Sequence, residues 1–182
     1  MMKNIILVGL KGTNKAEIGK DLAHRLKMKF IDTDDMMKKE SGLDLSELLK
    51  KIGEKHFRSL ENSVIENISD ISGAVIVAGG GSILNGKNMK ALKRNGLVVS
   101  LITSKIDFKR NRFEDEKSRL LSQWNQVFQS AKSILSLKTP SFTAADYIID
   151  VTDLSIEETS QKIIEKYGRG VINLDARKIE SI

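Results

Sequence analysis

The chain has 182 residues, of which 40% are hydrophobic and 30% charged, a composition typical of one globular domain; the absence of cysteine excludes disulfides and thiolate metal sites. Its net charge of +6 favours anionic partners. Aromatic residues make up only 5% and no nucleic-acid-binding motif is present, so a small phosphorylated ligand fits the charge better than nucleic acid.

Apolar, β-rich segments alternate with segments of helical periodicity, which predicts an α/β fold with a parallel sheet and helices on both faces. The first predicted strand, residues 5–8, is followed by a helix over residues 14–26.

Between them GLKGTNKA at residues 9–16 nearly matches the phosphate-binding P-loop pattern G-x-x-x-x-G-K-[ST]. In such a loop, backbone amides and the helix N-terminus hold phosphate, and Lys15 adds positive charge. A basic turn that binds nothing is the alternative.

Two residues depart from the P-loop pattern. Asn14 replaces the second glycine, but asparagine tolerates left-handed backbone better than other non-glycine residues. Ala16 replaces the hydroxyl residue that would hold Mg²⁺, and a water can fill this gap at some loss of metal affinity. The nucleotide site would be formed by Gly9, Gly12, Thr13, Asn14, Lys15 and Ala16.

The second predicted strand, residues 29–32, leads into two carboxylates, Asp32 and Asp34. The carboxyl ends of strands in a parallel sheet face the ligand crevice. One carboxylate can accept hydrogen bonds from a polyol or act as a base, and the other can orient hydrated Mg²⁺. The alternative is a helix cap followed by a turn aspartate, and we assign Asp35 to that structural class.

Helices are predicted over residues 46–52 and 58–67, and the second carries Arg58 and Glu61. A guanidinium can bind a carboxylate through two parallel hydrogen bonds, and a glutamate three residues on can hold the arginine in place. An ordinary surface salt bridge is the alternative. We assign His56 to the surface or to packing, without a catalytic role.

Residues 74–78 form a continuously apolar strand, as expected for the buried centre of a parallel sheet. Gly79, Gly80 and Gly81 follow, and they let backbone amides approach a ligand closely; a flexible turn is the alternative. Residues 97–102 are predicted to form a further buried strand.

Residues 110–121 are charged and poor in apolar side chains, which fits either a mobile loop over a ligand or a solvated helical surface. A fifth strand is predicted over residues 147–151.

A closing helix is predicted over residues 155–167, with Ser155 as its N-cap and two glutamates in its first turn. Gly168 and Gly170 are expected to stop it. The tail that follows, residues 171–182, is predicted to be a final strand, an interface arm or disordered.

No apolar run reaches the roughly 18 residues of a membrane span. The first predicted strand begins close to the start of the chain, which leaves no room for a signal peptide. We therefore expect a cytoplasmic, monomeric protein that contacts neither membrane nor nucleic acid.

Taken together in this order, these segments resemble the shikimate kinases, small P-loop kinases of the nucleoside-monophosphate-kinase fold. The resemblance extends to about residue 165 and rests on GLKGTNK at 9–15, FIDTDD at 30–35, FRSLE at 57–61 and AGGGSIL at 78–84. It implies a three-layer P-loop kinase fold with a five-stranded parallel sheet, helices on both faces and a mobile lid. The kinase-like domain would span residues 1–167, the lid about 110–124 and the tail 168–182.

The resemblance also implies that ATP and Mg²⁺ are used to phosphorylate shikimate. Asp34 would face the shikimate hydroxyls and assist deprotonation, while Arg58 would pair with the shikimate carboxylate. Lys15 would stabilise the transferring phosphoryl group, and Asp32 would position Mg²⁺ through water. The implied shikimate-binding residues are Asp34, Arg58, Gly79, Gly80, Gly81 and Lys138.

Two further positions depart from the family pattern. The family's lid carries R-P-L-L, whereas this chain has Ser118 at the arginine position, so Arg119 or Lys117 would have to reach the ATP phosphates instead. The second arginine for the shikimate carboxylate is replaced by Lys138, which keeps the charge but loses the forked geometry.

Two hypotheses follow. In the first, the chain is a divergent but working shikimate kinase. In the second, it is a non-catalytic relative that binds shikimate or a nucleotide as a regulatory or partner-binding module. The joint presence of Lys15, Asp32, Asp34 and Arg58 favours the first.

Overall fold

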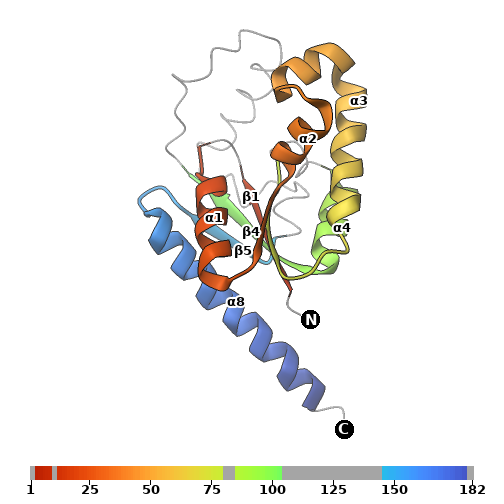
Figure 1. Cartoon of the computed structure of the whole chain (residues 1–182). Coiled ribbons are helices and arrows are strands. Elements are labelled where there is room, and N and C mark those ends of the chain that lie inside the picture. Colours follow the sequence, from red (N-terminus) through yellow and green to blue (C-terminus); the bar gives the residue numbers. More distant parts are fainter. Residues whose placement is uncertain (1–2, 10–11, 80–84, 104–144, 180–182) are drawn as a thin grey trace.

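The computed structural model describes residues 3–9, 12–79, 85–103 and 145–179, with side chains described as far as residue 168. In these residues, five strands form one parallel sheet in the order β2-β3-β1-β4-β5 (Figure 1). The strands are β1 (Asn4–Gly9), β2 (Lys29–Asp32), β3 (Ala74–Val77), β4 (Gly96–Ile102) and β5 (Tyr147–Asp150). The ends of each lie within one residue of the predicted strand, so the predicted five-stranded parallel sheet is confirmed.

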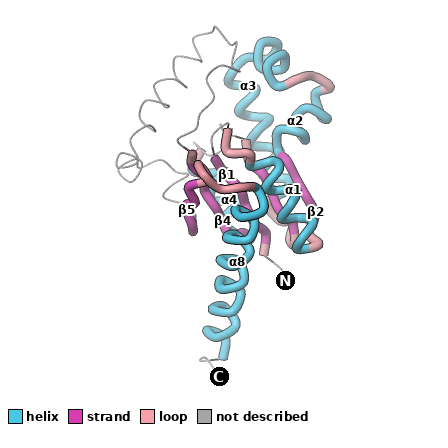
Figure 2. The backbone as a smooth tube through the Cα atoms, turned by 90° about the vertical axis from the view of Figure 1, so that its left-hand side faces the viewer, coloured by secondary structure: helices cyan, strands magenta, loops and turns pink. Residues whose placement is uncertain are grey.

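Helices cover both faces of the sheet, as Figures 1 and 2 show. Helices α1 (Lys15–Leu26) and α8 (Ile156–Ile179) pack on one face, and α3 (Leu45–Ile68) and α4 (Gly86–Arg94) pack on the other. This is the predicted three-layer arrangement.

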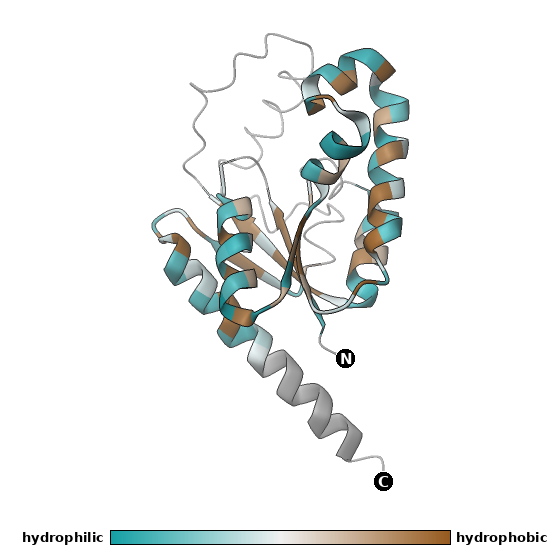
Figure 3. Cartoon of the chain, viewed as in Figure 1, coloured by the Kyte–Doolittle hydropathy of each residue, from teal (hydrophilic) through white to brown (hydrophobic). Residues whose placement is uncertain are grey.

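The central strand supplies both layers of the core, because successive side chains of a strand point to opposite faces. Ile5 and Leu7 of β1 pack against α1 and α8, whereas Ile6 and Val8 pack against α3 and α4. All four side chains are fully buried. Figure 3 shows the matching pattern on the helices, whose apolar residues face the sheet.

Helix α2 (Thr33–Ser41) and the first part of α3 rise above the carboxyl end of the sheet (Figure 1). A separate small core, formed by Met37, Leu48, Phe57 and Val64, packs them against the second part of α3. This unit places Asp34 and Arg58, which lie on these two helices, over the end of the sheet where a ligand would bind.

Helix α2 is absent from the elements predicted above, because its segment is charged and its adjacent methionines show no helical period. The two helices predicted over residues 46–52 and 58–67 form one element, α3, which bends at Gly53 (φ 73°, ψ 166°). The second part begins directly after this glycine, earlier than predicted.

The start of α8 agrees with its sequence signal. Ser155 Oγ accepts a hydrogen bond from Glu158 N at 3.1 Å, and Glu158 Oε2 accepts one from Ser155 N at 2.8 Å, which makes a reciprocal capping box. The predicted stop at Gly168 and Gly170 is wrong, because α8 continues to Ile179. A glycine inside a helix costs only about 1 kcal/mol, so it weakens a helix without ending it.

None of the helices in the described part of the chain is both long and apolar enough to cross a membrane.

The close packing of α1 on the sheet gives the first prediction. A methyl group on Gly19 would lie 2.7 Å from Val77 Cγ2 and 2.9 Å from Phe30 Cε2. We therefore expect Gly19→Ala to lower the free energy of unfolding by about 1–3 kcal/mol through overpacking, measured by urea denaturation.

The matched control is Gly86→Ala in the first turn of α4, where an added methyl group meets no atom within 4 Å. This variant should leave stability unchanged or raise it by up to about 1 kcal/mol. Equal urea midpoints for Gly19→Ala and the unmodified chain would contradict the packing of α1 described above.

Candidate active site

The phosphate loop leaves β1 at the centre of the sheet, where two backbones approach closely. A Cβ atom on Gly9 would lie 2.6 Å from the carbonyl oxygen of Leu101 on β4, so glycine is required there. Gly12 has a φ of 97°, a conformation that favours glycine. Asn14 adopts the left-handed conformation (φ 52°, ψ 30°), as its residue type predicted. Asn14 therefore replaces the second glycine of the motif while its backbone stays in the left-handed region.

Helix α1 begins directly after this loop, so the N–H groups of its first turn face the loop. Lys15 and Ala16, both half-buried, are its first two residues. A methyl group thus stands where the P-loop pattern has a hydroxyl.

A cavity of about 250 Å³ opens beside the phosphate loop. Residues 12–14 and Ile18 line one side, and the turn between β5 and α8 together with the first residue of α8 supplies most of the other, through Val151, Thr152, Leu154, Ser155 and Ile156. The sequence analysis did not assign this turn to the site, because it carries no glycine or charge motif. Its position could have been inferred only from the rule that all strands of a parallel sheet end at one edge.

Asp32 and Thr33 form the junction between β2 and α2. Asp32 is the N-cap of α2, and its Oδ1 accepts a hydrogen bond from Asp34 N at 2.9 Å. The helix-cap alternative is therefore correct for Asp32, although only one of its two carboxylate oxygens takes part. Asp35 is exposed and lies 3.8 Å from Lys38 Nζ, which agrees with its assignment to a structural class.

The half-buried Asp34 carboxylate lies among charged groups at the carboxyl edge of the sheet. Burial is the main cause that raises the pKa of Asp34, and the negative charges of Asp32 and Glu61 raise it further. The positive charge of Lys15 acts in the opposite direction, but the net pKa is above the usual value of an aspartate. Lys15 of the phosphate loop and Glu61 of α3 are therefore both close enough to influence this carboxylate.

Gly79 lies directly against Asp34. A Cβ atom at Gly79 would collide with Asp34 Oδ1, so the carboxylate rests on the glycine backbone. Gly79 N donates a hydrogen bond to Thr33 Oγ1 at 3.0 Å. Asp34 and Gly79, both implied shikimate-binding residues, are thus in contact, while Gly80 and Gly81 lie outside the described residues.

Two carboxylates hold Arg58. Its Nη1 lies 2.8 Å from Glu61 Oε2, and its Nε lies 3.0 Å from Glu54 Oε1. The i, i+3 salt bridge of the alternative is thus present, but one end of it is buried: the Glu61 side chain is only 4% exposed, whereas that of Arg58 is 38% exposed. Burial lowers the pKa of Arg58, but its hydrogen bond with Glu61 and the charges of both glutamates outweigh this and raise the pKa. Arg58 is therefore a permanently charged, oriented guanidinium.

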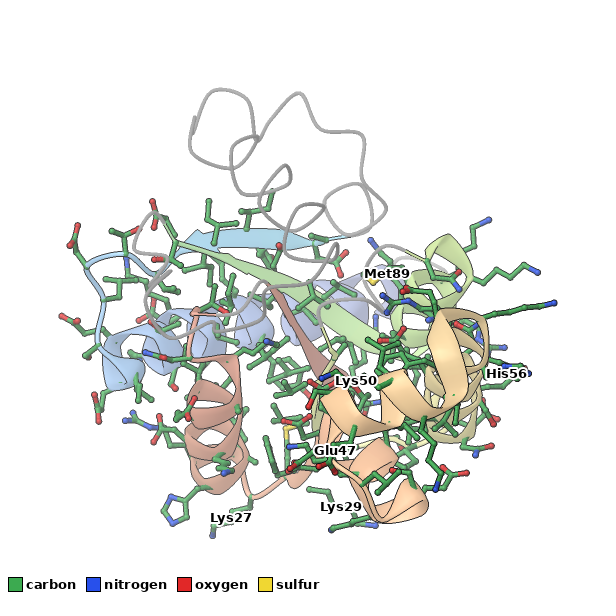
Figure 4. The ribbon with its side chains drawn as sticks, turned by 90° about the horizontal axis from the view of Figure 1, so that it is seen from above. Lys27, Lys29, Glu47, Lys50, His56 and Met89 are labelled. Atoms are coloured by element: carbon green, nitrogen blue, oxygen red, sulfur yellow. The ribbon has the colours of Figure 1, made fainter. Side chains whose placement is uncertain are left out.

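Sequence reasoning did not find Glu54. It lies four residues before Arg58, a helical spacing that would have been recognised had the helix been extended back to Gly53. His56, one of the residues labelled in Figure 4, lies on the outer side of α3, with its exposed Nδ1 3.1 Å from the Ile52 carbonyl oxygen. Its assignment to the surface is confirmed.

The described residues contain no group of three or more His, Cys, Asp or Glu side chains that could hold a metal ion. Magnesium in phosphoryl-transfer sites takes one or two carboxylates, with substrate phosphates and water completing its shell. Asp32, at the carboxyl end of β2, has the chemistry for that limited role. The predicted lid (residues 110–124) lies outside the described residues, as do Lys117, Ser118, Arg119 and Lys138.

Comparison with known proteins places these observations in a family. A family model for shikimate kinase matches residues 11–168. The shikimate kinase of Thermodesulfovibrio yellowstonii is 37% identical over 169 residues, which cover 92% of this chain and 96% of the relative. That of Caldanaerobacter subterraneus is 36% identical over 166 residues, or 91% and 96% of the two chains.

A solved structure agrees with the sequence comparison. The shikimate kinase from Acinetobacter baumannii in complex with shikimate matches with a TM-score of 0.75 and 27% identity, over 93% of this chain and 95% of that one. The family match spans most of the sequence, and the relatives resemble it along nearly their whole length. This chain belongs to the shikimate kinase family.

Proposed function

We propose that this chain transfers the terminal phosphoryl group of ATP to a hydroxyl group of shikimate, giving shikimate 3-phosphate. One observation carries the proposal: because β1, β2 and β3 run parallel, the loop that leads to Lys15, the Asp34 carboxylate and Gly79 lie at one edge of the sheet, with Asp34 against Gly79. The charges of Lys15 and of Glu61, the partner of Arg58, both act on Asp34. In this proposal Lys15 would bind phosphate, Asp34 would act as the base and Arg58 would bind the substrate carboxylate.

The acceptor side consists of Arg58 and Asp34. Glu54 and Glu61 orient the guanidinium of Arg58, which would bind the shikimate carboxylate. Asp34 would accept a hydrogen bond from the reacting hydroxyl. The raised pKa of Asp34 makes it a stronger base than an exposed aspartate. As the hydroxyl oxygen bonds to the terminal phosphorus, its proton passes to Asp34 and the bond from phosphorus to the ADP oxygen breaks.

The donor side consists of the phosphate loop and the start of α1. The N–H groups there would hold the ATP phosphates, with the nucleotide extending toward the cavity lined by the turn between β5 and α8. Lys15 would stabilise the charge that develops on the transferring group. Bound Mg²⁺ supplies further charge neutralisation for the phosphates, and Asp32 would hold one of its waters.

The non-catalytic alternative fits the site less well. A module that only bound shikimate would have no use for a lysine in a phosphate loop, and one that only bound nucleotide would have no use for Arg58. The family membership favours catalysis in the same way. The cytoplasmic location, the monomeric state and the domain boundary at residue 167 stay predictions from the sequence.

The first experiment measures ATP consumption by the purified chain with Mg²⁺, with and without shikimate. We expect consumption to depend on shikimate. Arg58→Ala should raise the KM for shikimate at least about tenfold and leave the KM for ATP nearly unchanged, because a charged pair with the substrate is lost.

Arg25→Ala is the matched control for Arg58→Ala, because Arg25 forms a comparable helical ion pair with Asp21 on α1 at 2.8 Å. Its kinetic constants should equal those of the unmodified chain. If shikimate raises the melting temperature but causes no ATP consumption at any Mg²⁺ concentration, the kinase proposal is wrong and the binding-module alternative holds.

The methyl group of Ala16 limits metal binding in this proposal. Ala16→Ser should therefore lower the Mg²⁺ concentration needed for half-maximal turnover, because a hydroxyl oxygen is a ligand that Mg²⁺ prefers. Ala16→Cys is a control of similar size with a soft sulfur, and it should show no such gain. An identical Mg²⁺ dependence for the serine and cysteine variants would show that this position does not contact the metal shell.

The raised pKa of Asp34 connects activity and stability. As the pH falls, Asp34 becomes protonated and can no longer act as the base. Because its pKa is raised, turnover should be lost at a higher pH than with an ordinary aspartate. The folded protein binds this proton more tightly than the unfolded chain does. The free energy of unfolding therefore decreases as the pH rises from the ordinary aspartate pKa through the raised pKa of Asp34. Asp34→Asn should therefore abolish turnover yet raise the melting temperature at pH 7, and this gain should vanish below the ordinary aspartate pKa.

Asp35→Asn is the control for this prediction, since the exposed neighbour faces only Lys38 in the described contacts. It should keep full activity and show no comparable gain in melting temperature. A decrease in the melting temperature of Asp34→Asn at pH 7 would contradict the assigned direction of the pKa.

A further inference from the structure

A fully buried threonine connects the two elements that form the acceptor side. Thr33 has no exposed surface, and its Oγ1 accepts the hydrogen bond from Gly79 N at 3.0 Å across 46 residues of sequence. In the pairing of β2 with β3, Asp32 stands opposite Val77. If β2 continued as a strand, the next bond would join Gly79 N to the backbone carbonyl of Thr33. The backbone turns into α2 at this residue, and the side-chain oxygen of Thr33 takes that hydrogen bond instead.

The chain leaving β3 is thereby fixed on both sides. Ala78 N donates to the carbonyl oxygen of Leu7 on β1 at 3.0 Å, while the next amide, that of Gly79, donates to Thr33. Gly79 is thus held in place although β3 ends at Val77.

The Asp34 carboxylate depends on the same contact. Its oxygen lies against Gly79, and a Cβ atom there would be 3.3 Å from Asp34 Cγ. Asp34 itself belongs to the first turn of α2, next to Thr33. The Thr33 hydroxyl therefore fixes the spacing between the helix that carries the carboxylate and the backbone on which the carboxylate rests.

We propose that Thr33 is a positioning residue for the acceptor substrate, and that its hydroxyl sets the relative position of Asp34 and the Gly79 backbone. Thr33 is buried and acts through these two residues, without contact to the substrate. The kinetic part of this inference rests on the proposed function, whereas the structural part can be tested without it.

The kinetic experiment compares Thr33→Val, which keeps the shape and removes the hydroxyl, with Thr33→Ser, which keeps the hydroxyl. We expect Thr33→Val to lower kcat/KM for shikimate about tenfold or more, because the buried Gly79 amide loses its acceptor. The KM for ATP should change less than about twofold, and Thr33→Ser should restore most of the loss. Thr33→Ala tests the same loss if the valine variant is too unstable to assay.

Ser69→Ala is the control for the removal of a buried hydroxyl elsewhere. The Ser69 hydroxyl donates to the Glu66 carbonyl at 2.8 Å and accepts from Arg94 at 3.1 Å, at the opposite end of β3. This variant should lower the melting temperature and leave both KM values unchanged. Two results would show that Thr33 is a purely structural residue and overturn the proposal. One is an equal loss of kcat/KM for shikimate and for ATP in Thr33→Val, and the other is no recovery of kcat/KM for shikimate in Thr33→Ser.

The second readout is hydrogen exchange of the Gly79 amide, followed by NMR without any substrate. Exchange should be at least about tenfold faster in Thr33→Val than in Thr33→Ser or Ser69→Ala. Unchanged Gly79 exchange would overturn the positioning role even in an active enzyme. If the unmodified chain consumed no ATP with shikimate while Gly79 exchange responded as expected, the proposed function would fail and the contact would stand.

Discussion

The parallel pairing of β3 with both β1 and β2 is the constraint on which the site depends. Since all three strands run in one direction, their carboxyl ends meet at the same edge. The phosphate loop follows β1, Gly79 follows β3, and Asp32 ends β2. These segments are separated by up to 70 residues in sequence (79 − 9), and only the sheet brings them together. A change of register in any one pair would move a phosphate-binding or acceptor-binding group away from the others.

Negative charge is concentrated at this edge at a cost in stability. Burial disfavours the charged form of Asp34, and the negative charges of Asp32 and Glu61 disfavour it further. Arg58 compensates Glu61 by direct contact, so the most deeply buried of these carboxylates is paired. For Asp34, burial and the two neighbouring carboxylates outweigh the positive charge of Lys15, so its pKa is raised. The same imbalance that weakens the folded state leaves a carboxylate ready to accept a proton, a common exchange of stability for activity.

The sequence predicted the parts of this structure that depend on local pattern. The strands are apolar runs bounded by polar residues, and the left-handed Asn14 follows from the conformational range of asparagine. The missed parts depend on tertiary contacts. Helix α2 is charged and is stabilised by burying Met37 against α3. The segment after β5 lines a cavity only because β5 ends at the common edge. The assigned roles of Lys15, Asp32, Asp34 and Arg58 stay predictions, though the structure brings these side chains to one edge of the sheet.

The central position of β1 has a consequence for the chain during its synthesis. Ile5 pairs with Val75 on one side and with Leu97 on the other, and Tyr167 donates a hydrogen bond to the Lys3 carbonyl at 2.7 Å. Because β1 is synthesised before β3 and β4, it would keep an unpaired edge until roughly 90 further residues were made, or about 5–20 s at typical rates. Its four consecutive apolar residues are then accessible to chaperones and to other nascent chains. The topology that centres the phosphate loop thus leaves this apolar strand open to aggregation until β4 is complete.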